Sequence, residues 1–193
     1  RAGAVNTLVF SGAEIHGDNT DGAGLVRDIV HNLGVSLAGK RILLLGAGGA
    51  SRGVIAPLLA EKPDSLFIAN RSAGKAEALA ASFADIAAVN AGNFAKTEGM
   101  TFDLVINATS ASLSGEALPL PNGIFAEGCV AYDMMYGKGE TPFLAQAREQ
   151  GAAQRSDGLG MLVEQAAEAF FVWRGVRPAT RRVLADLRSK LAQ

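Results

Sequence analysis

The chain has 193 residues, of which 49% are hydrophobic and 23 are glycine, and this suits one full domain with a buried sheet plus part of another. Eighteen basic and 19 acidic residues give a net charge of −1, which argues against nucleic acid or an anionic membrane as a partner. The single cysteine, Cys129, excludes a disulfide framework, and the absence of a signal-peptide pattern or an apolar run of bilayer length predicts no membrane span and a cytoplasmic location.

Two polar clusters precede the first predicted strand, at Gly3–Leu8 and Gly17–Gly22, and each contains an Asn-Thr pair. Amide and hydroxyl groups of this kind bind polyhydroxylated small molecules. Asp21 ends the second cluster and directly precedes a helical pattern over Gly22–Leu33, so spacing alone favours Asp21 as the cap of that helix. Both interpretations of Asp21, a helix cap and a ligand-binding group, stay open on this evidence.

A glycine-rich turn follows the first predicted strand. The segment Arg41–Arg52 runs from apolar residues into glycines and then into a helix, the order typical of dinucleotide-binding folds. Gly46 permits the tight turn, Gly48 lets the backbone approach a pyrophosphate, and Ser51 is small enough for close helix packing. The helix that opens near Ala50 offers unpaired N–H groups and a positive dipole end, so the turn predicts a phosphate site rather than an ordinary strand-to-helix connection.

The second predicted strand ends without the acidic residue that NAD-binding chains usually place on the ribose. Its last residue, Asn70, is followed by Arg71, Ser72 and, one helical turn on, Lys75. A guanidinium binds a 2′-phosphate through two parallel hydrogen bonds and stacks on adenine, whereas a carboxylate repels that phosphate. Solvated cations at a helix start are the alternative, but they oppose the helix dipole, so the pattern favours NADP over NAD.

The rest of the chain alternates strands and helices at the pitch of a doubly wound sheet. Further strands are expected at Ile86–Asn90, Phe102–Asn107, Cys129–Asp133 and Ala152–Ser156. Helices are expected at Ala50–Glu61, Ser72–Phe83, Thr141–Gln150, Met161–Gly175 and Pro178–Ala192, and a loop at Gly115–Gly128. We therefore expect an α/β fold with a Rossmann-type, doubly wound and mostly parallel sheet that carries helices on both faces.

Eight motifs, taken together, are far more specific than the glycine turn: Ala4–Thr7, Gly17–Gly22, Gly46–Arg52, Asn70–Ser72, Ile106–Ser110, Tyr132–Tyr136, Thr141–Phe143 and Asp157–Gln165. In this combination the chain resembles the shikimate dehydrogenase family, NADP-dependent enzymes of aromatic amino-acid biosynthesis. The resemblance implies reversible reduction of 3-dehydroshikimate to shikimate by NADPH, with the substrate in a cleft between two domains. It also implies the domain division: a remnant of the substrate domain at 1–21, an NADP-binding domain at 22–157 that opens with a linking helix at 22–34, and helices at 158–193 that pack toward the substrate domain.

The resemblance also implies roles for individual residues. Asp21 becomes the carboxylate half of the family's Lys/Asp catalytic pair, which helps to protonate the alkoxide formed by hydride transfer to a ketone. The implied substrate ligands are Asn6, Asp21, Tyr136 and Gln165. The implied cofactor ligands are Gly46, Ala47, Gly48, Gly49 and Ala50 for the phosphates, Asn70, Arg71, Ser72 and Lys75 for the adenosine 2′-phosphate, and Thr109, Met134 and Gly158 for the nicotinamide half. Without the resemblance, Tyr136 is interpreted as a half-buried aromatic residue and Gln165 as a polar residue on a helix face.

The family's catalytic lysine and its Ser-x-Ser pair precede the position of Asn6. We therefore expect the chain to be a fragment that binds NADP(H) and lacks that lysine, since Lys40, Lys62 and Lys138 do not stand in the family's motif. Uncovered faces of the C-terminal helices then predict a homodimer or self-association. Two alternatives remain: a quinate/shikimate dehydrogenase of broader specificity, and a non-catalytic nucleotide-binding module.

Other polar and aromatic residues are expected to have structural roles. His16 and His31 lack partners at the spacing of a zinc site or a hydrolase triad, so no metal is expected and both are predicted at the surface. Asp133 lies in a predicted strand and is interpreted as structural rather than as a general base. The aromatic residues of the penultimate helix are predicted as helix core or as an interface: Phe170, Phe171 and Trp173.

Overall fold

A computed structural model describes residues 2–111, 115 and 117–192. Its main body is a parallel six-stranded sheet of order β5-β4-β3-β6-β7-β8. The strands are β3 (Arg41–Leu45), β4 (Ser65–Ala69), β5 (Asn90–Gly92), β6 (Phe102–Asn107), β7 (Phe125–Asp133) and β8 (Gln154–Ser156). The chain moves outward from β3 in both directions, the classic order of a dinucleotide-binding domain, so the predicted fold class is confirmed.

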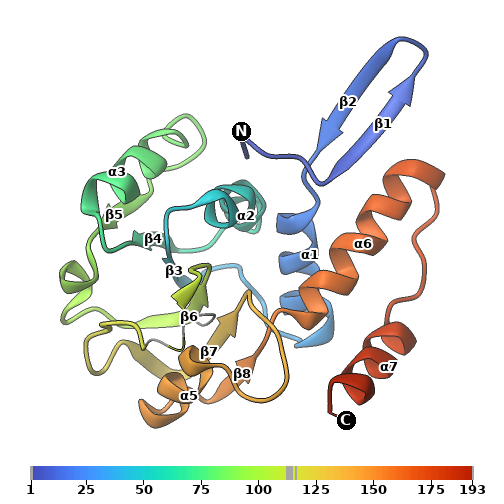
Figure 1. The fold of residues 1–193 in the computed structure, drawn as a ribbon. Helices are drawn as coiled ribbons and strands as arrows, with labels where there is room; N and C mark the ends of the chain where they lie inside the picture. The colour runs from blue at the N-terminus through green and yellow to red at the C-terminus, as the bar shows by residue number, and fades with distance from the viewer. Residues whose placement is uncertain (1, 112–114, 116, 193) are drawn as a thin grey trace.

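The helices around this sheet are α1 (Asp21–Arg27), which continues into a π-helix at Asp28–Asn32, α2 (Gly49–Ala60), α3 (Ala73–Ala81), α5 (Pro142–Glu149), α6 (Leu159–Arg174) and α7 (Arg181–Leu191). A short 3₁₀ helix at Phe94–Thr97 follows β5. Figure 1 shows α1 and α6 side by side at one end of the molecule and α5 beside β7 and β8. No helix of the described residues is both long and apolar enough to cross a membrane.

Two hydrophobic cores cover the two faces of the sheet. Ile42 and Leu44 of β3 contribute to the core under α1, α2, α3 and α6, whereas Leu43 and Leu45 contribute to the core under α5. Because successive side chains of a strand point to opposite faces, a strand that is buried on both sides reads as a continuous apolar run. This is why β3 and β4 were recognisable from the sequence.

The amino ends of β3 and β6 are joined by an ion pair. Nε and Nη2 of Arg41 donate to the two carboxylate oxygens of Asp103 over 3.0 and 2.9 Å. The side-chain hydrogen bonds from Arg41 lower the pKa of Asp103 to about 2. This pair lies at the end of the strands opposite to the glycine turn.

Three expectations about the strands need correction. The strand expected at Ile86–Asn90 forms only at Asn90–Gly92, because Ile86 and Ala87 donate backbone hydrogen bonds to Phe83 in turns that follow α3. Ile86 is consequently 45% exposed. The strand expected to begin at Cys129 begins at Phe125, within the segment expected to be loop. That early part pairs with Phe102 through a register shift that sequence periodicity does not reveal.

The third correction concerns the N-terminal segment, which forms a β-hairpin of β1 (Thr7–Ser11) and β2 (Glu14–Asp18). Figure 1 shows this hairpin projecting from the body next to α6. Nε1 of Trp173 on α6 donates to the backbone oxygen of Leu8 on β1 over 2.9 Å. Trp173 is 53% exposed, and Phe170 and Phe171 are 43% and 44% exposed, so the expectation that these residues form helix core is wrong.

Candidate functional site

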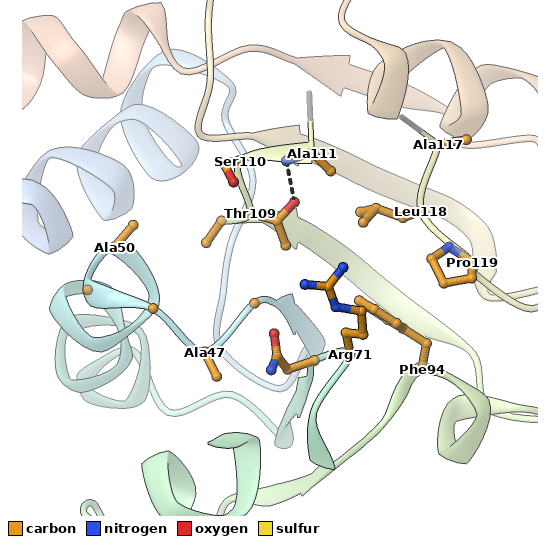
Figure 2. Close-up of a pocket in the computed structure, with 15 residues that line it drawn as sticks. Ala47, Ala50, Arg71, Phe94, Thr109, Ser110, Ala111, Ala117, Leu118 and Pro119 are labelled. Atoms are coloured by element: carbon orange, nitrogen blue, oxygen red, sulfur yellow. Dashed lines mark hydrogen bonds between the residues drawn. The ribbon is translucent and has the colours of Figure 1, made fainter. Parts of the chain in front are cut away.

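A pocket of about 500 Å³ lies at the carboxyl ends of β3, β4 and β6. Its described lining comprises Gly46, Ala47, Gly48, Gly49, Ala50, Asn70, Arg71, Phe94, Ala108, Thr109, Ser110, Ala111, Ala117, Leu118 and Pro119 (Figure 2). In an open parallel sheet, ligands bind where the chain leaves neighbouring strands in opposite directions, and here that point is the end of β3. We refer to it below as the dinucleotide pocket.

The glycine turn forms one wall of the dinucleotide pocket. Gly46 has a φ of +108°, a conformation that other residues rarely adopt, and a Cβ there would lie 3.1 Å from the backbone oxygen of Ala108. A Cβ built on Gly48 or on Gly49, in contrast, would meet no other atom within 4 Å. The 12-residue helix α2 begins at Gly49 with no acidic residue in its first turn. Its unpaired N–H groups and positive dipole end therefore face an open space suited to a phosphate.

Arg71 is the only charged residue in the described lining, and no acidic residue accompanies it. Figure 2 shows its guanidinium extending into the pocket between the glycine turn and Phe94. The Nδ2 of Asn70 donates to the backbone oxygen of Ser72 over 3.1 Å and so shapes the turn that carries Arg71. The electrostatic character at this end of the pocket is therefore positive, as an adenosine 2′-phosphate requires.

Other predicted cofactor ligands lie outside the described lining. Ser72 precedes the first residue of α3 as its N-cap, and Lys75 is exposed on the first turn of that helix. Met134 and Gly158 lie against each other, since a Cβ on Gly158 would be 2.2 Å from the backbone oxygen of Met134. Their roles toward a cofactor stay predictions.

A second polar cluster brings together three of the four predicted substrate ligands. Nδ2 of Asn6 donates to Oδ1 of Asp21 over 2.8 Å and to Oε1 of Gln165 over 3.4 Å. Oδ1 of Asn6 accepts from the backbone N and the hydroxyl of Thr20 over 3.0 and 3.1 Å. We call Asn6, Thr20, Asp21 and Gln165 the Asn6 cluster. Tyr136, the fourth predicted ligand, is 43% exposed, and no hydrogen bond in the described part of the chain joins it to this cluster.

Asp21 is not the cap of α1. The N-cap is Thr20, Asp21 is the first helical residue, and its carboxylate accepts a hydrogen bond from Asn6 instead. The interpretation as a helix cap is therefore wrong, and a role of Asp21 in ligand binding stays a prediction. Among the described residues, no lysine forms an ion pair or hydrogen bond with that carboxylate.

The Asn6 cluster depends on a close contact between α1 and α6. A Cβ on Gly24 of α1 would lie 2.7 Å from the backbone N of Gln165 and 2.8 Å from the backbone oxygen of Met161. Both atoms belong to the rigid backbone of α6, so only glycine allows this approach. Two turns of helix thus meet closely enough for Asp21 and Gln165 to reach the same amide of Asn6.

We expect Gly24→Ala to destabilise the fold by about 1–3 kcal/mol, because an added methyl group forces backbone to move in a packed contact. Urea unfolding measures the change. The matched control is Gly74→Ala in α3, where a Cβ meets nothing within 4 Å and alanine is the better helix former. A Gly24→Ala protein as stable as the Gly74→Ala protein would contradict the packing argument.

Polar side chains join α1 and the π-helix that follows it to α6 and β7, and three of them, Asp28, Tyr132 and Glu164, are buried. The hydroxyl of Tyr132 donates to Oδ2 of Asp28 over 2.7 Å, and Nδ2 of Asn32 donates to Oδ1 of Asp28 over 2.8 Å. Nδ2 of Asn32 also donates to Glu164 over 3.2 Å, and Nε of Arg27 donates to the same carboxylate over 3.3 Å. Burial raises the pKa of Asp28 and of Tyr132. These bonds hold α1 and α6 against the sheet.

Sequence reasoning missed several residues that the fold adds to the two sites. Phe94, Leu118 and Pro119 line the dinucleotide pocket although they lie in segments to which no function was assigned. Phe94 follows β5, so a correct position for that strand would have indicated it.

His16 and His31 are exposed as expected, and Asp133 is fully buried and hydrogen-bonded, as its structural interpretation requires.

Two family models and several curated proteins match the sequence of this chain. The model described as shikimate / quinate 5-dehydrogenase matches residues 27–114, and the model of the shikimate 5′-dehydrogenase C-terminal domain matches residues 158–188. A curated relative from Dechloromonas aromatica, named shikimate dehydrogenase (NADP(+)), is 78% identical over 99% of this chain and 70% of its own length. The chain belongs to the shikimate dehydrogenase family. A second member of the family, from Aromatoleum aromaticum, is 63% identical over 98% of this chain and 69% of its own length.

Solved structures of a shikimate dehydrogenase and of two other enzymes are similar to this fold. Shikimate 5-dehydrogenase of Thermus thermophilus, solved with NADP(H) and shikimate, has a TM-score of 0.82 and 32% identity, and the match covers 97% of this chain and 69% of that one. An Ael1 enzyme from Pseudomonas putida has a TM-score of 0.90 and 52% identity over 96% of this chain and 68% of that one. The 5-ketofructose reductase of Gluconobacter has a TM-score of 0.80 and 33% identity over 97% of this chain and 69% of that one.

Proposed function

We propose that this chain is the cofactor-binding part of an NADP-dependent shikimate dehydrogenase, which interconverts 3-dehydroshikimate and shikimate. One observation carries the cofactor assignment: Arg71 is the only charged residue in the described lining of the dinucleotide pocket. The name of the 78% identical relative supports both the cofactor and the reaction.

The arrangement suggests how the cofactor lies. Gly48, Gly49 and the start of α2 would hold the phosphates, and Arg71, on the β4 side of β3, would hold the adenosine 2′-phosphate. Thr109, which follows β6 on the opposite side of β3, would then hold the nicotinamide half. NADPH, when bound, supplies the hydride that reduces the ketone.

The Asn6 cluster supplies the substrate-side chemistry. Asn6 and Gln165 offer amide groups to the hydroxyls of a polyhydroxylated ring, and Asp21 takes part in moving the proton to or from the reacting oxygen. The lysine partner of Asp21 stays an implication of the family resemblance, since none of the lysines among the described residues forms a hydrogen bond or ion pair with that carboxylate. Tyr136 is kept as a further substrate ligand.

The same proposal divides the chain into domains. Residues 1–21 belong to the substrate domain, residues 22–157 form the NADP-binding domain, and the helices at 158–193 pack toward the substrate domain. The exposed side chains Phe170, Phe171 and Trp173 on α6 make self-association through the C-terminal helices an additional expectation. The cytoplasmic location also stays a prediction.

Titration of the chain with NADP⁺ and NAD⁺ tests the cofactor assignment, and we expect a clear preference for NADP⁺.

A fusion protein tests the reaction. The N-terminal part of the Dechloromonas aromatica relative is fused ahead of this chain, and we expect the fusion to oxidise shikimate with NADP⁺. Turnover of quinate at a similar rate would favour the broader quinate/shikimate activity. Cofactor binding by a fusion that oxidises neither compound would favour the non-catalytic module.

A further inference from the structure

A fully buried amide and carboxylate face each other at the carboxyl ends of two neighbouring strands. Asn107 ends β6 and Asp133 ends β7, and the two residues are register partners. Nδ2 of Asn107 donates to Oδ1 of Asp133 over 3.0 Å. Neither residue belongs to the described lining of the dinucleotide pocket.

The amide of Asn107 holds the loop that lines that pocket. Its Oδ1 accepts from the backbone N of Thr109 over 3.0 Å and from the Thr109 hydroxyl over 2.7 Å. Oγ1 of Thr109 in turn accepts from the backbone N of Ala111 over 3.3 Å, the contact drawn in Figure 2. The orientation of one buried amide therefore sets the position of the loop from Thr109 to Ala111.

The carboxylate of Asp133 organises the end of β7. Its Oδ1 also accepts from the backbone N of Met135 over 3.1 Å, and its Oδ2 accepts from the hydroxyl of Thr141 over 2.6 Å. Thr141 is the N-cap of α5, where its hydroxyl accepts from Leu144. All these contacts lie on the β6 and β7 side of β3, whereas Arg71 lies on the β4 side.

We propose that Asp133 is a positioning residue for the nicotinamide half of the cofactor, acting through Asn107 on the Thr109 loop; this rests on the NADP site proposed above. A carboxylate accepts hydrogen bonds but donates none, so it forces Asn107 to turn Nδ2 toward Asp133 and Oδ1 toward Thr109. Alanine at position 133 removes that constraint, whereas asparagine would keep its oxygen toward Asn107, because the backbone N–H of Met135 donates to the same atom. Asn107 then gains a flipped state in which Nδ2 faces Thr109, and an NH₂ group cannot accept from the Thr109 backbone N–H.

Asp133→Ala, which removes the acceptor of Asn107, tests this without requiring turnover. Two ligands are titrated into the 193-residue chain and its variant: NADP⁺, which fills the whole pocket, and adenosine 2′,5′-bisphosphate, which carries only the adenosine end. We expect NADP⁺ affinity to fall by about tenfold, the order of one lost buried hydrogen bond, and the bisphosphate affinity to stay within about twofold. General destabilisation of the fold would not separate the two ligands in this way.

Asn107→Ala serves as a second variant, because it removes the amide that links Asp133 to Thr109 and leaves the Thr109 side chain in place, and the same selective loss of NADP⁺ affinity is expected. This variant tests the positioning role if Asp133→Ala does not fold. The matched control is Asp103→Ala, which removes a carboxylate from the opposite ends of the strands and is expected to leave both affinities unchanged.

Equal losses for the two ligands, or an unchanged NADP⁺ affinity, in the folded variant would overturn the positioning role while leaving the proposed function intact. An unmodified chain that binds neither ligand would instead refute the proposed NADP site, and the positioning role with it.

Discussion

Asp21→Asn is expected to lower kcat for shikimate oxidation by roughly 10²–10⁴, the usual contribution of a positioned acid–base group, in the fusion described above. The substituted amide keeps an oxygen that can accept from Nδ2 of Asn6, so the contact seen at 2.8 Å survives. What is lost is a carboxylate able to exchange a proton with its partner. Steady-state kinetics with saturating NADP⁺ measures the effect.

The cofactor site provides the internal control for this experiment. NADP⁺ affinity should stay unchanged in the Asp21→Asn protein, because Asp21 does not line the dinucleotide pocket. Glu14→Gln, on the exposed hairpin, removes an equal charge and should leave kcat unaltered. An Asp21→Asn enzyme with wild-type kcat would remove Asp21 from the chemistry.

Arg71→Asp is expected to weaken NADP⁺ binding by about 1.5–3 kcal/mol, which corresponds to roughly 10- to 150-fold, and to favour NAD⁺ in relative terms. The substitution removes a guanidinium that reaches into the pocket and adds a carboxylate that repels the 2′-phosphate but accepts from ribose hydroxyls. Fluorescence or calorimetric titration with both cofactors measures the change in preference.

Lys75→Asp makes the same change of charge one helical turn farther along. Because Lys75 is exposed and lies outside the described lining, its substitution should weaken NADP⁺ less than Arg71→Asp does. Equal affinity of the unmodified chain for NADP⁺ and NAD⁺ would contradict the cofactor assignment.

The cofactor side of the site was largely predictable because its signals are local. The strand, the glycine turn and helix α2 occupy consecutive residues, and strand β4 delivers Asn70 and Arg71 directly to the same edge of the sheet. Parallel strands place their carboxyl ends together, so two such segments suffice to predict a shared pocket. Phe94 and Leu118 escaped prediction because Phe94 lies in a short 3₁₀ helix after β5 and Leu118 in an irregular segment, and local periodicity specifies the path of neither.

The substrate side of the site was less predictable, because its residues lie far apart in the sequence. Motif resemblance indicated Asn6, Asp21 and Gln165, but nothing in their spacing shows that they share hydrogen bonds across 159 positions of the chain. That meeting depends on Gly24, whose missing side chain lets α1 approach the backbone of α6. The sequence by itself determined the parallel sheet, the glycine turn and the basic residue at the end of β4, since each follows from apolar periodicity or from neighbouring residues. Only the tertiary structure decided the Asn6 cluster and the buried Asn107–Asp133 pair, because close packing between elements and pairing between strands bring together residues that no local pattern connects.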